Sequence, residues 1–143
     1  MPTVVYFGDR YNKFKAAFKY DSLFYAENLP PKKSCDIVVI DGCPKNTDRV
    51  PMGTVGVVFS ENLKGLECLM RSGVRTVTCG MSHRDTVTVS SSVPELVICL
   101  QRRLPNFNGP ILEPQEIPAA PIFDDISLTL LVAGTKLLCG INP

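Results

Sequence analysis

The sequence has almost no excess of charge of either sign, because its 143 residues include 15 lysines and arginines and 14 aspartates and glutamates. A net charge of +1 creates no long-range field that would attract nucleic acid or an anionic membrane. There is also no basic cluster of the kind that binds a phosphate backbone, since the densest basic spots are Lys32-Lys33 and Arg102-Arg103. We therefore expect neither nucleic acid nor a membrane as a partner.

The sequence also lacks a long uninterrupted apolar run. The most apolar region, residues 126–139, contains a serine, two threonines and a lysine, and it is too short and too polar to cross a bilayer. Residues 1–14 lack the basic start and the apolar core of a signal peptide. These absences predict a cytoplasmic protein.

Six cysteines are present, but no two of them have the C-x-x-C spacing. Zinc sites and redox motifs need two close thiols on a turn, so we expect no metal and no cofactor. Cys43 follows an expected strand in a polar loop. The remaining cysteines lie in apolar runs, where they are typical of small hydrophobic residues in a reducing compartment: Cys35, Cys68, Cys79, Cys99 and Cys139.

What the sequence does contain is an alternation of buried strands and helices in its first half. Continuous apolar runs at residues 3–7, 36–40 and 55–59 predict strands that are covered on both faces. Helical spacing of apolar residues predicts a helix over 11–20, and residues 23–26 suit a short second strand.

The region after residue 59 predicts a strand–helix–strand unit. We expect Ser60 to cap a helix with an apolar stripe formed by Leu63, Leu66, Leu69 and Met70. Gly73 ends this helix at the position where glycine is common. A strand over 74–79 then follows, which implies a parallel pair with a right-handed crossover.

The pattern changes after residue 85. Residues 85–90 alternate with period two, and short strands at 96–101 and 111–117 predict an antiparallel extension in which two prolines favour an edge position. A helix over 122–139 ends at Gly140. We expect one α/β domain over residues 1–143, with a three-layer Rossmann-like sheet that is parallel in its first half.

Three short motifs mark this order: Asp41-Gly42 after a central strand, Cys79-Gly80 after a later one, and Leu-Leu-Cys-Gly ending at Gly140. Over residues 35–140 the order resembles the later part of the ATP-binding central domain of the Mur ligases, which add amino acids to peptidoglycan precursors. The resemblance implies the same kind of scaffold.

The chain departs from that family where ATP would bind. No G-x-x-x-x-G-K-[ST] loop is present, and the turn Gly8-Asp9-Arg10 after the first strand is too short to hold phosphates. The family's His-Asn pair at the start of the closing helix is replaced by Phe123-Asp124-Asp125-Ile126. We therefore do not expect ligase activity, and we interpret the chain as a relative that kept the scaffold and lost the nucleotide site.

A ligand site is nevertheless expected at the carboxyl ends of the parallel strands, where open α/β sheets bind their ligands. At an expected helix start Ser60 would favour an anion, and Asp41 could bind Mg²⁺. The alternative is ordinary turn and cap chemistry without a ligand. The residues at this edge are Gly8, Asp9, Asp41, Gly42, Ser60 and Asn62.

The only histidine, His83, lies with Arg84 and Asp85 on a turn between two expected strands. An imidazole beside a cation and a carboxylate is suited to acid–base work or to binding an anion. The alternative is a polar turn in which Asp85 bonds to the turn backbone.

Two functional hypotheses follow, with a response-regulator-like receiver as a weaker third. The first is a non-catalytic domain that acts through protein contacts or self-association, to which the edge residues Gln115-Glu116 and the apolar segment 117–122 could contribute. The second is a small-molecule or nucleotide-binding protein, enzymatic or not, with its site near Asp9, Asp41 and His83. A cluster of these side chains around one cavity favours the second, and their scatter favours the first.

Overall fold

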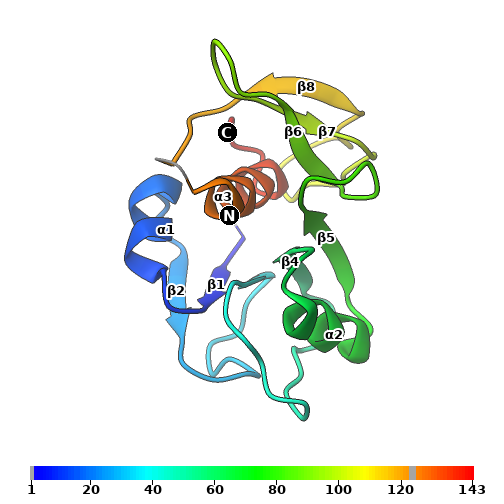
Figure 1. The fold of residues 1–143 in the computed structure, drawn as a ribbon. Helices are drawn as coiled ribbons and strands as arrows, with labels where there is room; N and C mark the ends of the chain where they lie inside the picture. The colour runs from blue at the N-terminus through cyan, green and yellow to red at the C-terminus, as the bar shows by residue number, and fades with distance from the viewer. Residues whose placement is uncertain (1, 123–124) are drawn as a thin grey trace.

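The computed structural model describes residues 2–122 and 125–143, and within them one eight-stranded sheet carries helices on both faces (Figure 1). The strand order is β2-β1-β3-β4-β5-β6-β7-β8. The elements in chain order are β1 (Val4–Phe7), α1 (Tyr11–Phe18), β2 (Leu23–Ala26), β3 (Ile37–Ile40), β4 (Val55–Phe59), α2 (Leu63–Ser72), β5 (Arg75–Cys79), β6 (Val87–Ser91), β7 (Val97–Leu100), β8 (Gln115–Pro118) and α3 (Ile126–Leu138).

The sheet changes from parallel to antiparallel along its length, as the sequence predicted. The strands from β2 to β5 pair in parallel, and β6 joins β5 through the single parallel pair Cys79↔Val87. The strands β6, β7 and β8 then pair antiparallel, with β8 at the edge. The expected α/β fold with an antiparallel end and a closing helix is therefore confirmed.

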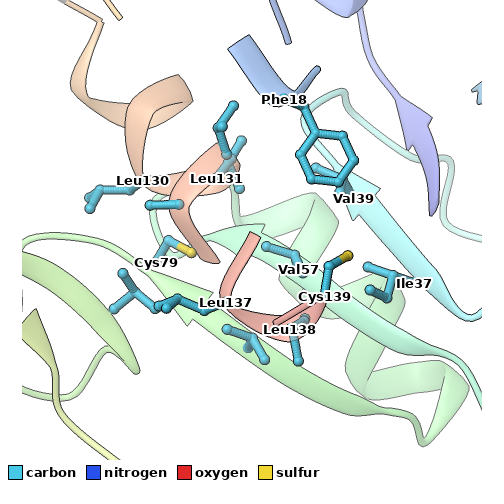
Figure 2. Close-up of a cluster of buried hydrophobic side chains, with 14 of the residues drawn as sticks. Phe18, Ile37, Val39, Val57, Cys79, Leu130, Leu131, Leu137, Leu138 and Cys139 are labelled. Carbon is cyan, nitrogen blue, oxygen red and sulfur yellow. The ribbon is translucent and has the colours of Figure 1, made fainter. Parts of the chain in front are cut away.

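Helices cover the two faces of the parallel strands unequally. On one face, Val39 and Val57 pack with Phe18 of α1 and with the leucines of α3 (Figure 2). On the other face, Val38 and Val58 pack against Cys68 and Leu69 of α2. Burial on both sides explains why β3 and β4 are continuous apolar runs rather than alternating ones.

The helix α3 is the most buried helix, with residues 128–135 buried between α1 and the strands β3 to β6. A helix that is apolar on all sides needs such surroundings. It begins at Ile126, after the Asp125 cap, and not at residue 122 as expected; Phe123 and Asp124 lie outside the described residues. Gly140 follows its end with a φ of 73°, the left-handed conformation that glycine adopts most readily.

Ser60 does not cap α2, which corrects the expectation above. The helix begins at Leu63, and the Asn62 side chain accepts a hydrogen bond from the Gly65 amide at 3.1 Å. Ser60 instead continues the pairing of β4 with β5, because its amide donates to the Cys79 carbonyl at 2.8 Å. Ser60 thus lies directly after the end of β4. It does not lie at the N-terminus of α2, where an anion was expected to bind.

The described helices also bear on the membrane question. None of them has both the length and the apolar character that crossing a bilayer requires.

Candidate functional site

The centre of the candidate site is an ion pair between Arg10 and Asp41, at the carboxyl ends of β1 and β3. The guanidinium binds the carboxylate with two nitrogens, Nη2 to Oδ1 at 2.5 Å and Nε to Oδ2 at 2.8 Å. This two-pronged geometry is the strongest that arginine offers a carboxylate. Only 6% of the Asp41 side chain is exposed, so its charge depends on Arg10 for compensation.

A second carboxylate, Asp125, binds the same guanidinium from the start of α3. Arg10 Nη1 lies 2.6 Å from Asp125 Oδ2, and Nη2 donates to Ser127 Oγ at 3.2 Å. The other oxygen of Asp125 accepts hydrogen bonds from the Leu128 amide and the Ser127 hydroxyl. Arg10 therefore joins the edge of the sheet to the first turn of α3.

The buried Tyr6 hydroxyl completes this cluster. It donates to Asp41 Oδ2 at 2.5 Å and accepts from the Arg10 amide at 2.8 Å. Burial, followed by the hydrogen bond to Asp41, raises the pKa of Tyr6 far above its ordinary value. Tyr6 is consequently a fixed hydrogen-bond donor and not an acid that exchanges its proton near neutral pH.

The pKa values of Arg10 and Asp125 reflect this pairing. The hydrogen bond to Asp41 is the main reason why the pKa of Arg10 is raised. Burial acts to raise the pKa of Asp125, but the Leu128 amide and Arg10 outweigh it and hold this pKa below its ordinary value. One cation thus faces two anions, and the cluster has no positive charge left over for a phosphate group.

The strand-end cleft is an open hollow of about 780 Å³ beside this cluster. Of the residues predicted from the sequence, Asp41 and Asn62 line it, together with Arg10, Lys13 and Glu61. The Asn62 amide makes two hydrogen bonds within the protein, because its Nδ2 donates to the Gly42 carbonyl at 2.8 Å and its Oδ1 accepts from the Gly65 amide at 3.1 Å.

Gly8 and Asp9 line a neighbouring hollow of about 530 Å³, which shares Arg10 and Lys13 with the strand-end cleft. Gly8 packs directly on the next strand end, since a Cβ there would lie 2.9 Å from both Asp41 Cβ and the Gly42 amide nitrogen. The structure thus brings four of the sequence-predicted positions, Gly8, Asp41, Gly42 and Asn62, into direct contact at one edge.

His83 and Arg84 lie outside both hollows, exposed on the turn between β5 and β6. Asp85 is buried and accepts a hydrogen bond from the Ser82 amide at 3.0 Å, which is the turn-backbone role weighed above. Ser60 faces Asp85 across Gly80, whose Cα leaves no room for a side chain between them. Among the described residues, no three His, Cys, Asp or Glu side chains are placed to share a metal ion.

The sequence reasoning missed Tyr6, Arg10 and Asp125 as members of the site. Asp125 had a detectable signal, because an aspartate directly before an apolar helix is a typical N-cap. Arg10 directly follows the Gly8-Asp9 turn, but its partners are 31 and 115 positions away. Such distant pairings have no local signature in a single sequence.

No protein-family model, curated protein or solved structure matches this chain. The site is therefore interpreted from its own geometry.

Proposed function

We propose that this chain is a non-catalytic α/β domain that works through self-association, on a three-layer Rossmann-like scaffold related to the central domain of the Mur ligases. The observation that carries the proposal is the internal pairing of Arg10 with Asp41 and Asp125. In an α/β enzyme, charged side chains at the strand ends would face the ligand. Here they bind one another, and their ion pairs link the edge of the sheet to the start of α3.

The turn between β1 and α1 supports the loss of a nucleotide site. Only Gly8, Asp9 and Arg10 separate the two elements, so too few backbone amides are available to surround a phosphate. The guanidinium in this turn is neutralised by carboxylates. The change from parallel to antiparallel strands is the arrangement that the Mur-ligase resemblance implies, which supports the proposed kinship.

The outer face of α2, formed by Leu63, Lys64, Glu67 and Met70, supports self-association. The sequence suggested that Leu63 and Met70 belong to the stripe that packs on the sheet, but they are 65% and 69% exposed. They lie seven residues apart and therefore on one side of the helix, opposite the buried Cys68 and Leu69.

A two-fold contact suits this face, because Glu67 lies between the two apolar side chains and Lys64 flanks them. An antiparallel arrangement of two copies would place Glu67 of each near Lys64 of the second copy. A two-fold interface uses the same surface on both copies, so it requires such self-complementarity.

Sedimentation over a wide range of protein concentration tests this proposal. We expect a monomer–dimer equilibrium that is abolished by the double substitution Leu63→Lys with Met70→Lys. Val93→Lys is the matched control, because Val93 is 79% exposed and lies between β6 and β7, away from α2. A chain that stays monomeric at every concentration, or dimers that the double variant leaves intact, would contradict self-association.

A second candidate function is small-molecule binding in the strand-end cleft, which the convergence of Arg10, Asp41 and Asn62 favours. Thermal unfolding with ATP, UDP-sugars and Mg²⁺ separates it from the first, since a ligand of the native state raises the midpoint. We expect no shift. A saturable shift that disappears in Glu61→Gln, a variant of an exposed residue in the cleft, would establish the second function instead.

A further inference from the structure

A separate cavity, with a volume of about 600 Å³, lies between α1 and α3. We call it the α1–α3 cavity. One wall is α1, a second is α3, and the segment 119–122 that connects β8 to α3 closes a third side. Lys13 and Ile122 separate it from the strand-end cleft, which they also line.

The cavity exists because small residues face one another across these segments. Ala16 and Ala17 on α1, Ala119 and Ala120 on the connecting segment, and Ala133 on α3 all line it. Methyl side chains are too short to fill the space between two helices, whereas protein interiors are normally close-packed. The remaining wall is largely apolar and includes Pro121, Ile122 and Val132.

Three lysines line this apolar cavity, and no aspartate or glutamate does so among the described residues. The side chains of Lys13, Lys19 and Lys136 have no hydrogen-bond or ion-pair partner in the described part of the chain. Burial and the nearby Lys19 both lower the pKa of Lys136. Positive charge is thus gathered at an apolar surface that has no acidic side chain among the described lining residues.

The lysines also give the cavity a direction. Lys19 follows the end of α1 and Lys136 lies in the last turn of α3, and the two are near enough to repel each other. Lys13 lies six residues before Lys19, which corresponds to about 9 Å along a helix. One end of the cavity therefore carries two cations, and the alanine wall runs from there toward Lys13.

We propose that the α1–α3 cavity binds an aliphatic carboxylic acid of medium chain length, with its carboxylate at Lys19 and Lys136 and its hydrocarbon chain along the alanine wall. The apolar wall accounts for the chain and the unpaired lysines account for the charge. A nucleotide fits less well, because the described lining residues include no aromatic ring on which a base could stack. This proposal does not depend on self-association.

The competing explanation is that the two lysines only stabilise helix ends, where cations interact favourably with the last carbonyl groups. That role requires no ligand. It predicts that replacing either lysine changes the stability of the protein and that the protein does not bind a carboxylic acid in this cavity.

Calorimetric titration with octanoate, octanol and acetate distinguishes the two explanations. We expect saturable binding of octanoate, with octanol and acetate much weaker because each lacks either the charge or the chain. Lys19→Gln and Lys136→Gln should each weaken octanoate binding about tenfold or more, as expected for a lost charge-assisted hydrogen bond. Lys15→Gln is the matched control, since Lys15 is an exposed lysine of α1 that does not line the cavity.

A filling substitution gives an independent test. Ala16 is exposed to solvent at the cavity, so Ala16→Leu should leave the fold intact, as judged by circular dichroism, and should block octanoate. Absence of saturable octanoate binding would overturn the proposal. So would equal binding of octanol, or unchanged affinity in both lysine variants.

Discussion

Arg10 is the residue on which most of the polar structure at the strand ends depends. Asp41 is nearly inaccessible to water, so removing the guanidinium leaves a carboxylate without its counter-charge. We expect Arg10→Leu to lower the free energy of unfolding by about 2–4 kcal/mol, the cost of an unpaired and largely buried charge. Urea denaturation measures this loss.

The matched control for Arg10 is Arg103, whose pair with Glu113 is 3.1 Å long but about two-thirds exposed on both sides. Solvent screens such a pair, so Arg103→Leu should cost less than about 1 kcal/mol. Similar losses of unfolding free energy in the two variants would show that the Arg10 ion pairs do not stabilise the fold more than an exposed pair does.

Asp125 makes the stability of the protein depend on pH in a defined direction. Its pKa in the folded protein lies below its ordinary value, so the folded state stabilises the ionised form. The resulting stability is present above the ordinary aspartate pKa of about 3.9 and is lost as the pH falls through the lower, folded value. Asp125→Asn should therefore flatten the decline of unfolding free energy in acid.

Urea denaturation at a series of pH values from neutral into this acid range checks the prediction. Asp21→Asn is the control, because Asp21 is exposed and makes no described hydrogen bond or ion pair. An acid decline equally steep in Asp125→Asn and in the unchanged protein would rule out the contribution of Asp125.

At the scale of elements, the short turn between β1 and α1 requires glycine. Gly8 has a φ of 155°, and a Cβ there would lie within 2.9 Å of the Tyr6 hydroxyl, Asp41 Cβ and the Gly42 amide nitrogen. The Gly42 backbone and the Asp41 Cβ attached to its own backbone cannot move aside cheaply, so Gly8→Ala should lower the unfolding free energy by about 2–4 kcal/mol through crowding and backbone strain together.

Gly53 offers the matched comparison for Gly8. It has a φ of 87° but nothing within 4 Å of its added Cβ, so Gly53→Ala isolates the backbone cost, about 1 kcal/mol. Thermal or urea unfolding of both variants separates the two contributions. If Gly8→Ala were no worse than Gly53→Ala, the close approach of the two strand ends would not be important for stability.

Elements were predictable where a local pattern decides them. The runs of Val and Ile in β3 and β4 predict buried strands, and Gly73 predicts the end of α2. The start of α2 was misjudged because Ser60 and Asn62 are both good caps, and the choice depends on strand pairing between Ser60 and Cys79. The exposure of Leu63 and Met70 was also unpredictable, since apolar side chains on one helix do not reveal which of them reach the sheet.

At the scale of the whole molecule, α3 connects the two parts of the sheet. It packs on the parallel strands β3, β4 and β5 and also on β6, with which the antiparallel part begins. Direct pairing between β5 and β6 is limited to Cys79 and Val87. Sequence patterns predicted the succession of elements, but the dependence of both parts on one buried helix arises only from packing.

The six free cysteines report whether this packing makes the chain unfold as one unit. Cys43 is exposed, whereas Cys68, Cys79 and Cys139 are buried. Burial raises the pKa of Cys139 to about 12 and also raises that of Cys79. Because the thiolate is the reactive form, neither residue should react with a thiol reagent until the protein opens.

Cys68 lies in the cluster under α2, while Cys79 and Cys139 lie in the cluster around α3 on the opposite face of the sheet. If the two faces unfold together, the three cysteines should become labelled at one common rate as urea is raised, after immediate labelling of Cys43. Mass spectrometry of the labelled peptides measures each rate. Substantially faster labelling of Cys68 would show that α2 opens separately. Only Cys79 and Cys139, on the α3 face of the sheet, would then share a common labelling rate.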